Sequence, residues 1–161
     1  MSSASASFKV VKEKTDLSSR SSIMLMLDYN RPPMAMRAAN FLRSALALDR
    51  RGNEGAAIPL YRRAIRLGLQ GDSLRDALVC LGSSLRSVGE IAAAKRILLK
   101  GRRQFPGDPV VILFLSLVEH DAGSPSLAVR QLASLYLGTT TDRGVAKYRS
   151  VLRRKFHGLG R

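Results

Sequence analysis

The sequence predicts an all-α protein made of antiparallel helix pairs, and three observations support this fold class. Leu, Ala and Arg dominate from about residue 34, aromatic residues make up only 6%, and Trp is absent, a composition that favours helices. Apolar residues in the same region recur at i, i+3, i+4 and i+7. Glycine- and proline-containing breaks divide the region into segments of similar length, and short connections between such segments produce antiparallel helix hairpins.

Residues 1–33 differ from the rest of the chain. They begin with a Ser-rich stretch, carry mixed charges without a sustained apolar period, and end at Pro32 and Pro33. This pattern predicts a largely disordered N-terminal tail. The alternative is a short strand or helix at residues 23–27 that docks on the domain. The remaining length fits a single domain.

Seven helices are expected after the tail, each ending at a break that contains Gly or Pro. Capping oxygens are expected from Asp72-Ser73, and from Asp108 and Ser124 with a proline directly after each of them. The expected helices span residues 35–50, 54–67, 73–88, 90–104, 109–122, 125–137 and 141–156.

An internal repeat runs through the helical region. Gly52, Gly89 and Gly123 each stand between the two helices of successive pairs, and the last two are 34 residues apart while the first two are 37 apart. The pattern is fullest in the second pair, which reads Leu78-x2-Leu81-Gly82-x2-Leu85, then Ala94-x3-Leu98, Gly101 and Pro106.

This pattern resembles the tetratricopeptide repeat, which has the same period and the same alternation of large and small residues. The first and third pairs carry weaker versions, centred on Ala45 and Ala57 and on Ser116 and Ala128. Small residues at these positions allow two helix backbones to approach closely. The resemblance is to short stand-alone bacterial members of the family, and it implies a right-handed α-solenoid of three antiparallel helix pairs at residues 34–137.

The last expected helix lies outside the repeat period. Residues 138–161 are predicted to form a basic C-terminal capping helix and tail, because the final repeat would otherwise expose an apolar face. Five apolar residues at helical spacing are expected to form the inward stripe of this helix, and they are Val145, Tyr148, Val151, Leu152 and Phe156.

No catalytic residue, metal site or cofactor is expected. His120 and His157 are isolated and Cys80 is the only cysteine, so the ligand spacing of a zinc site is missing. Neither a Walker-type phosphate loop nor a dinucleotide fingerprint is present. Glu119, His120 and Asp121 are consecutive and point in different directions around a helix, so they are interpreted as a polar helix end. The sequence therefore predicts a protein that is not an enzyme.

The family resemblance implies that the first helix of each pair lines an inner groove, where a peptide or protein segment binds, as in a scaffold or adaptor. Some family members hold a chaperone's acidic tail there with a Lys, Asn and Arg clamp, which Arg75, Val79 and Ser83 do not match. Whether the last helix or the N-terminal tail covers the groove leucines in the third pair is left open. The projected groove residues are Leu42, Leu46, Asp49, Arg50, Asp76, Val79, Ser83, Arg86, Leu113, Leu117, His120 and Asp121.

The net charge of +15 predicts a positive surface that attracts nucleic acid, anionic lipid or an acidic protein. Phosphate contacts need little beyond Lys and Arg, so an RNA- or DNA-associated protein is the alternative function. A merely solvated basic face is the competing interpretation. The expected basic surface consists of Arg62, Arg63, Arg66, Lys95, Arg96, Lys100, Arg102, Arg103, Arg149, Arg153 and Arg154.

The sequence also allows expectations about localisation, membrane insertion and assembly. The lone Cys80 lies in an apolar run, which favours a reducing compartment. The longest apolar run, residues 110–118, is too short to span a bilayer, so membrane insertion is not expected and a cytoplasmic protein is. A monomer is favoured over a dimer, which would form through an uncovered terminal face of the stack.

Overall fold

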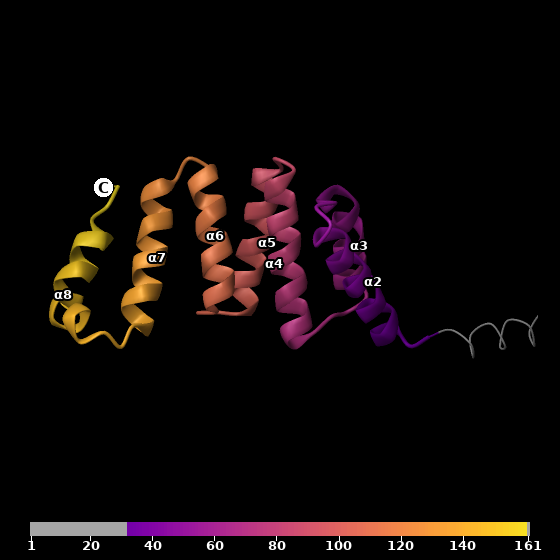
Figure 1. Ribbon diagram of the computed structural model, residues 1–161, viewed down its shortest axis with the longest axis horizontal. Helices are drawn as coiled ribbons and strands as arrows, with labels where there is room; N and C mark the ends of the chain where they lie inside the picture. The colour runs from indigo at the N-terminus through magenta and orange to yellow at the C-terminus, as the bar shows by residue number, and fades with distance from the viewer. Residues whose placement is uncertain (1–31, 161) are drawn as a thin grey trace, which may run out of the picture. The chain divides into compact units, whose positions relative to one another are not determined.

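The computed structural model describes residues 32–160, and within this range every regular element is a helix (Figure 1). The prediction of an all-α fold is confirmed. The prediction of a disordered tail at residues 1–33 falls outside the described residues except for Pro32 and Pro33. The helices are α2 (Met34–Asp49), α3 (Glu54–Arg66), α4 (Gly71–Ser87), α5 (Ile91–Gln104), α6 (Pro109–Asp121), α7 (Pro125–Thr139) and α8 (Arg143–His157).

Helix starts show where local sequence decides the fold and where it does not. The Asp108 carboxylate accepts a hydrogen bond from the Val111 amide at 3.0 Å, as expected for an N-cap. The prediction for Asp72-Ser73 is wrong: α4 begins at Gly71, and its N-cap Gln70 makes no side-chain capping bond. Ser124 is the N-cap residue of α7, but its side chain makes no capping hydrogen bond, contrary to the prediction. In both cases the helix is held by its packing rather than by its cap.

Successive helices pack side by side along the chain, and the most extensive contacts are those of α2 with α3, α4 with α5, and α6 with α7 (Figure 1). The core between them consists of the large residues of the repeat pattern together with its small ones. Tyr61, Leu78, Leu85 and Leu98 are fully buried. A Cβ added to Gly82 would lie 2.6 Å from Leu98 Cγ, so the small residue here permits the close approach that the pattern predicted.

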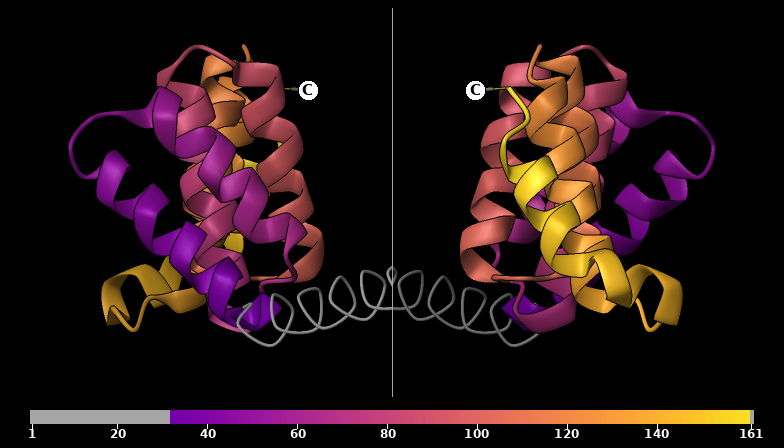
Figure 2. Two further views of the ribbon diagram at one scale, coloured as in Figure 1. Left: turned by 90° about the vertical axis from the view of Figure 1, so that its right-hand side faces the viewer. Right: turned by 90° about the vertical axis from the view of Figure 1, so that its left-hand side faces the viewer.

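The last helix packs differently from the expected cap. Among the described helices α8 contacts only α7, over which it lies when the row is seen end-on (Figure 2, right). None of its side chains is fully buried, and Tyr148 and Val151 are 63% and 41% exposed. The expected inward position of these two residues is therefore wrong, because contact with a single helix buries only a narrow stripe.

That narrow stripe contains Val145, Leu152 and Phe156, which are half-buried. Arg149 lies beside them and its guanidinium donates a hydrogen bond to the Thr140 carbonyl oxygen at 2.9 Å. A residue assigned to the outer basic surface thus anchors α8 to the loop before it.

Candidate functional site

Helices α2, α4 and α6 lie on the inner side of the row. Besides the contacts between successive helices, α2 contacts α4 and α4 contacts α6. Helices α3, α5 and α7 make no contacts of this kind with one another. Because the first helices of the pairs are closer together than the second ones, the row of described helices curves with α2, α4 and α6 on its concave side.

The predicted groove residues differ greatly in exposure along this concave side. Leu42 and Val79 are buried, and Leu46 and Ser83 are half-buried. Leu42 lies on α2 and Val79 on α4, and each of these helices is followed by another first helix that packs against it. Leu42 and Val79 therefore belong to the packed interior rather than to an open groove.

Helix α6 has no further first helix beyond it, and its apolar residues stay uncovered. Leu113 and Leu117 are 45% and 47% exposed, and Val110 is exposed as well. The three residues are spaced at i, i+3 and i+7, so they share one face of the helix. We call Val110, Leu113 and Leu117 the α6 stripe. The alternative that the last helix covers it is wrong, because α8 does not contact α6. The other alternative, cover by the N-terminal tail, concerns residues outside the described range.

Asp49, a predicted groove residue, is used inside the protein. One of its carboxylate oxygens accepts a hydrogen bond from the Tyr61 hydroxyl at 2.7 Å and the other accepts one from Ser84 Oγ at 2.9 Å. Burial, followed by the Asp49 hydrogen bond, raises the pKa of Tyr61 far above its usual range. The carboxylate thereby joins the first repeat to the second.

The nearby Cys80 should react slowly in the folded chain. Burial raises the pKa of its thiol, although the Tyr61 hydroxyl acts in the opposite direction. A raised pKa lowers the fraction of reactive thiolate at neutral pH, so alkylation at pH 8 should be at least about tenfold slower than in urea. The sulfur is the only thiol in the chain, so mass spectrometry measures the rate directly. Equal rates in the folded and unfolded chain would show an open thiol.

Arg86 and Asp121 form a second cross-repeat contact on the concave side. Arg86 Nε donates to Asp121 Oδ2 at 2.6 Å and joins α4 to α6. His120 Nδ1 lies 3.2 Å from the other oxygen of this carboxylate. The His120 contact, followed by the Arg86 contact, holds the pKa of Asp121 below its usual value. These charges are therefore already engaged before any partner binds.

Two further charged residues, Asp76 and Arg50, were predicted to line the groove. Asp76 accepts hydrogen bonds from the neighbouring Arg75 at 2.9 and 3.1 Å. Arg50 is exposed at the end of α2. The concave side thus presents an apolar stripe at one end and paired polar groups along the remainder.

Lys95 was assigned to the outer basic surface, but it takes part in an interior ion pair. Its ammonium lies 2.7 Å from Glu119 Oε2, and Glu119 is only 2% exposed. The pair joins α5 to α6 across the second repeat interface. Sequence reasoning treated Glu119 as part of a polar helix end, although its place in the pattern, usually aromatic or aliphatic, was a signal that it faces the core.

The remaining basic residues differ in whether they have an interaction partner. Arg62 pairs weakly with Glu90 at 3.9 Å, and the Arg63 guanidinium lies 5.6 Å from the centre of the Phe41 ring, within cation–π range. Lys100 is half-buried. The exposed residues without a hydrogen bond or ion pair inside residues 32–160 are Arg66, Arg96, Arg102, Arg103, Arg153 and Arg154.

Two further features of residues 32–160 bear on metal binding and on membrane crossing. No three His, Cys, Asp or Glu side chains there lie together in a group that could hold a metal ion. No helix among residues 32–160 is both long enough and apolar enough to cross a membrane.

The family model described as tetratrico peptide repeat matches residues 37–153, which include six of the seven described helices in full or nearly so and most of α8. No curated protein matches the chain.

Proposed function

Because the chain belongs to the tetratricopeptide repeat family, we propose that it is a non-catalytic interaction module that holds a segment of another protein on its concave side. Repeat folds of this kind create extended concave surfaces used for binding. A scaffold or adaptor role fits this arrangement.

The observation that carries the proposal is the α6 stripe. Three apolar side chains at helical spacing remain exposed at the place where the stack ends its series of first helices. Apolar groups at i, i+3 and i+7 match the spacing with which an amphipathic helix docks in a groove. The favoured partner segment is therefore apolar on one face.

The polar groups beside the stripe argue against recognition of a strongly acidic tail. Arg86 is neutralised by Asp121, and Arg75 pairs with Asp76. Neither cation is therefore free to hold an acidic segment, whose carboxylates would meet Asp76 and Asp121 in the same contacts.

The double variant Leu113→Arg/Leu117→Arg should lose its partner. Placing two guanidinium groups in the stripe makes docking of an apolar face unfavourable, and binding should weaken by at least about tenfold. Affinity capture from a cell lysate, quantified by mass spectrometry, identifies the partners retained by wild type and lost by the variant.

The matched control is Val129→Arg/Tyr136→Arg on α7, which also replaces two exposed apolar residues in the third repeat. The control should retain the same partners as wild type, with both folds verified by circular dichroism. Equal recovery of every partner by the stripe variant and by wild type would contradict the concave-side proposal.

Nucleic acid is the alternative partner, favoured by the exposed arginines without ion pairs inside residues 32–160. Single-strand binding depends on aromatic side chains on which bases stack. Tyr61 is fully buried and Phe156 half-buried, which leaves Tyr136 on α7 and Tyr148 on α8 as exposed aromatic side chains. A protein partner is therefore preferred.

A further inference from the structure

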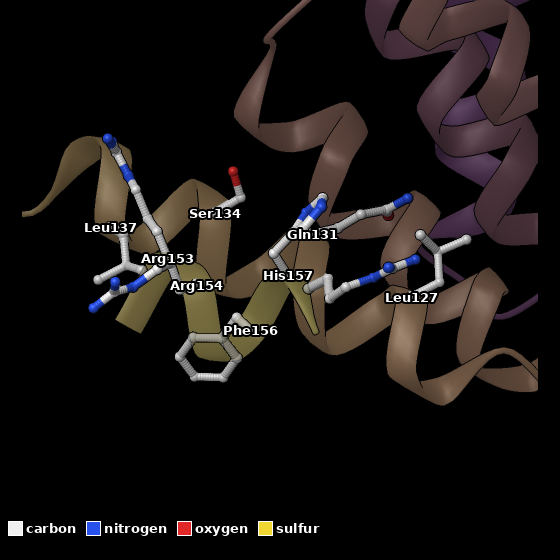
Figure 3. Close-up of a pocket in the computed structure, with 9 residues that line it drawn as sticks. Leu127, Gln131, Ser134, Leu137, Arg153, Arg154, Phe156 and His157 are labelled. Atoms are coloured by element: carbon white, nitrogen blue, oxygen red, sulfur yellow. The ribbon is translucent and has the colours of Figure 1, made fainter. Parts of the chain in front are cut away.

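An open pocket of ≈ 770 Å³ lies between α7 and α8 (Figure 3). Leu127 and Leu137 from α7 and Phe156 from α8 give it apolar walls. The pocket exists because α8 packs on α7 through a narrow stripe of half-buried residues and leaves the adjoining faces of the two helices apart. Its volume lies in the range of about 300–1,000 Å³ that is usual for ligand sites.

The polar side of this pocket is strongly cationic. Arg130 from α7 and Arg153 and Arg154 from α8 line it, and no lining residue is acidic. Within residues 32–160 none of the three guanidinium groups has an ion-pair partner. Three cationic side chains thus line one cavity without an acidic side chain in its lining, and an anionic ligand would complement their charge.

A second pocket of ≈ 410 Å³ continues the surface along α7. Gln131 and Ser134 line both pockets, and Arg102 and Ile112 belong to the second one. The two pockets together form an elongated surface along α7 that combines apolar side chains with arginines. None of the α6 stripe residues lines either pocket, so this surface is separate from the concave site.

We propose that the pocket between α7 and α8 binds an acidic peptide segment that carries an apolar anchor side chain. Guanidinium groups match carboxylates with two parallel hydrogen bonds, and the Leu127 and Phe156 walls receive the anchor. The aromatic side chains of the cavity are Phe156 and the His157 imidazole, which offer less stacking surface than the platforms of single-strand binding proteins. This site is additional to the concave site of the proposed function and does not depend on it.

The probe is a fluorescently labelled short peptide with one Leu flanked by Glu residues. The fluorescence anisotropy of this peptide, measured while the full chain is added, gives its affinity. The variant Arg130→Gln/Arg153→Gln/Arg154→Gln should bind at least about tenfold more weakly, because it loses all three carboxylate contacts. The matched control Arg66→Gln/Arg96→Gln/Arg103→Gln removes the same charge elsewhere and should stay within about threefold of wild type.

Two further measurements separate the pocket from general charge attraction. Ser134→Trp fills the cavity without changing any charge and should weaken binding as much as the arginine variant. A probe with Ser in place of Leu should bind more weakly to wild type than the Leu probe. Equal losses in the two arginine variants, unchanged affinity of Ser134→Trp, or tighter binding of a single-stranded RNA with the same number of charges would each overturn the proposal.

Discussion

Gly82→Ala is expected to lower the free energy of unfolding by about 1–3 kcal/mol, although alanine is the better helix former. Gly82 is buried inside α4, and the added Cβ would lie 2.6 Å from Leu98 Cγ and 2.9 Å from Leu98 Cδ2. Leu98 is fully buried, so its branch carbon cannot withdraw without disturbing its neighbours. Urea denaturation of the full chain, followed by circular dichroism, measures the loss.

Gly55→Ala is the matched control, because Gly55 is also helical but has no atom within 4 Å of an added Cβ. This variant should gain about 0.5–1 kcal/mol, so the two glycine changes have opposite signs. In the double variant Gly82→Ala/Leu98→Ala the shortened side chain makes room, and the total loss should be smaller than the sum of the single losses. Stabilisation by Gly82→Ala would disprove the close approach of α4 and α5.

Lys95→Met should destabilise the protein by about 2–4 kcal/mol. Removing one partner of a buried ion pair typically costs about 3–5 kcal/mol, because the other charge is left buried without compensation. Lys95 itself is 35% exposed, so water can partly replace it and the expected loss is somewhat lower.

Removing Glu119, the other partner of the ion pair, should change stability much less. Glu119→Leu removes the buried charge and leaves the Lys95 ammonium free to reach solvent, so stability should stay within about 1 kcal/mol of wild type. The double variant Lys95→Met/Glu119→Leu should resemble Glu119→Leu alone. The melting temperatures of all three variants give the comparison. A Lys95→Met protein with the melting temperature of wild type would show that the buried Glu119 is not stabilised by Lys95.

These interface contacts bear on binding because they connect successive repeats. Asp49 with Ser84, Arg86 with Asp121, and Lys95 with Glu119 each link one helix pair to the next. Loosening such a contact changes how neighbouring repeats stack, and in repeat proteins stability is largely a sum of nearest-neighbour terms. The position of the α6 stripe at the end of the series therefore depends on the contacts before it.

The helices and their breaks could be predicted from the sequence because their causes are local. Apolar spacing, the Gly52, Gly89 and Gly123 turns, and the Asp108-Pro109 start each act within a few residues of the chain. The repeat period carried this further, because a pattern that recurs reports which residues face one another. The sequence marks Gly82 as a small crossing residue and Leu98 as a large core residue, and the structure places one against the other.

Which helical faces remain open was decided only by the tertiary structure. Leu42, Val79 and Leu113 hold corresponding places in the repeat pattern, yet the first two are covered and the third is exposed, because only α2 and α4 are followed by another first helix. Glu119 and Lys95 likewise meet across an interface between different pairs. The pocket between α7 and α8 arises from the packing of a helix outside the period. Coverage, pairing and cavities depend on neighbours distant in sequence, and helical periodicity describes each helix alone.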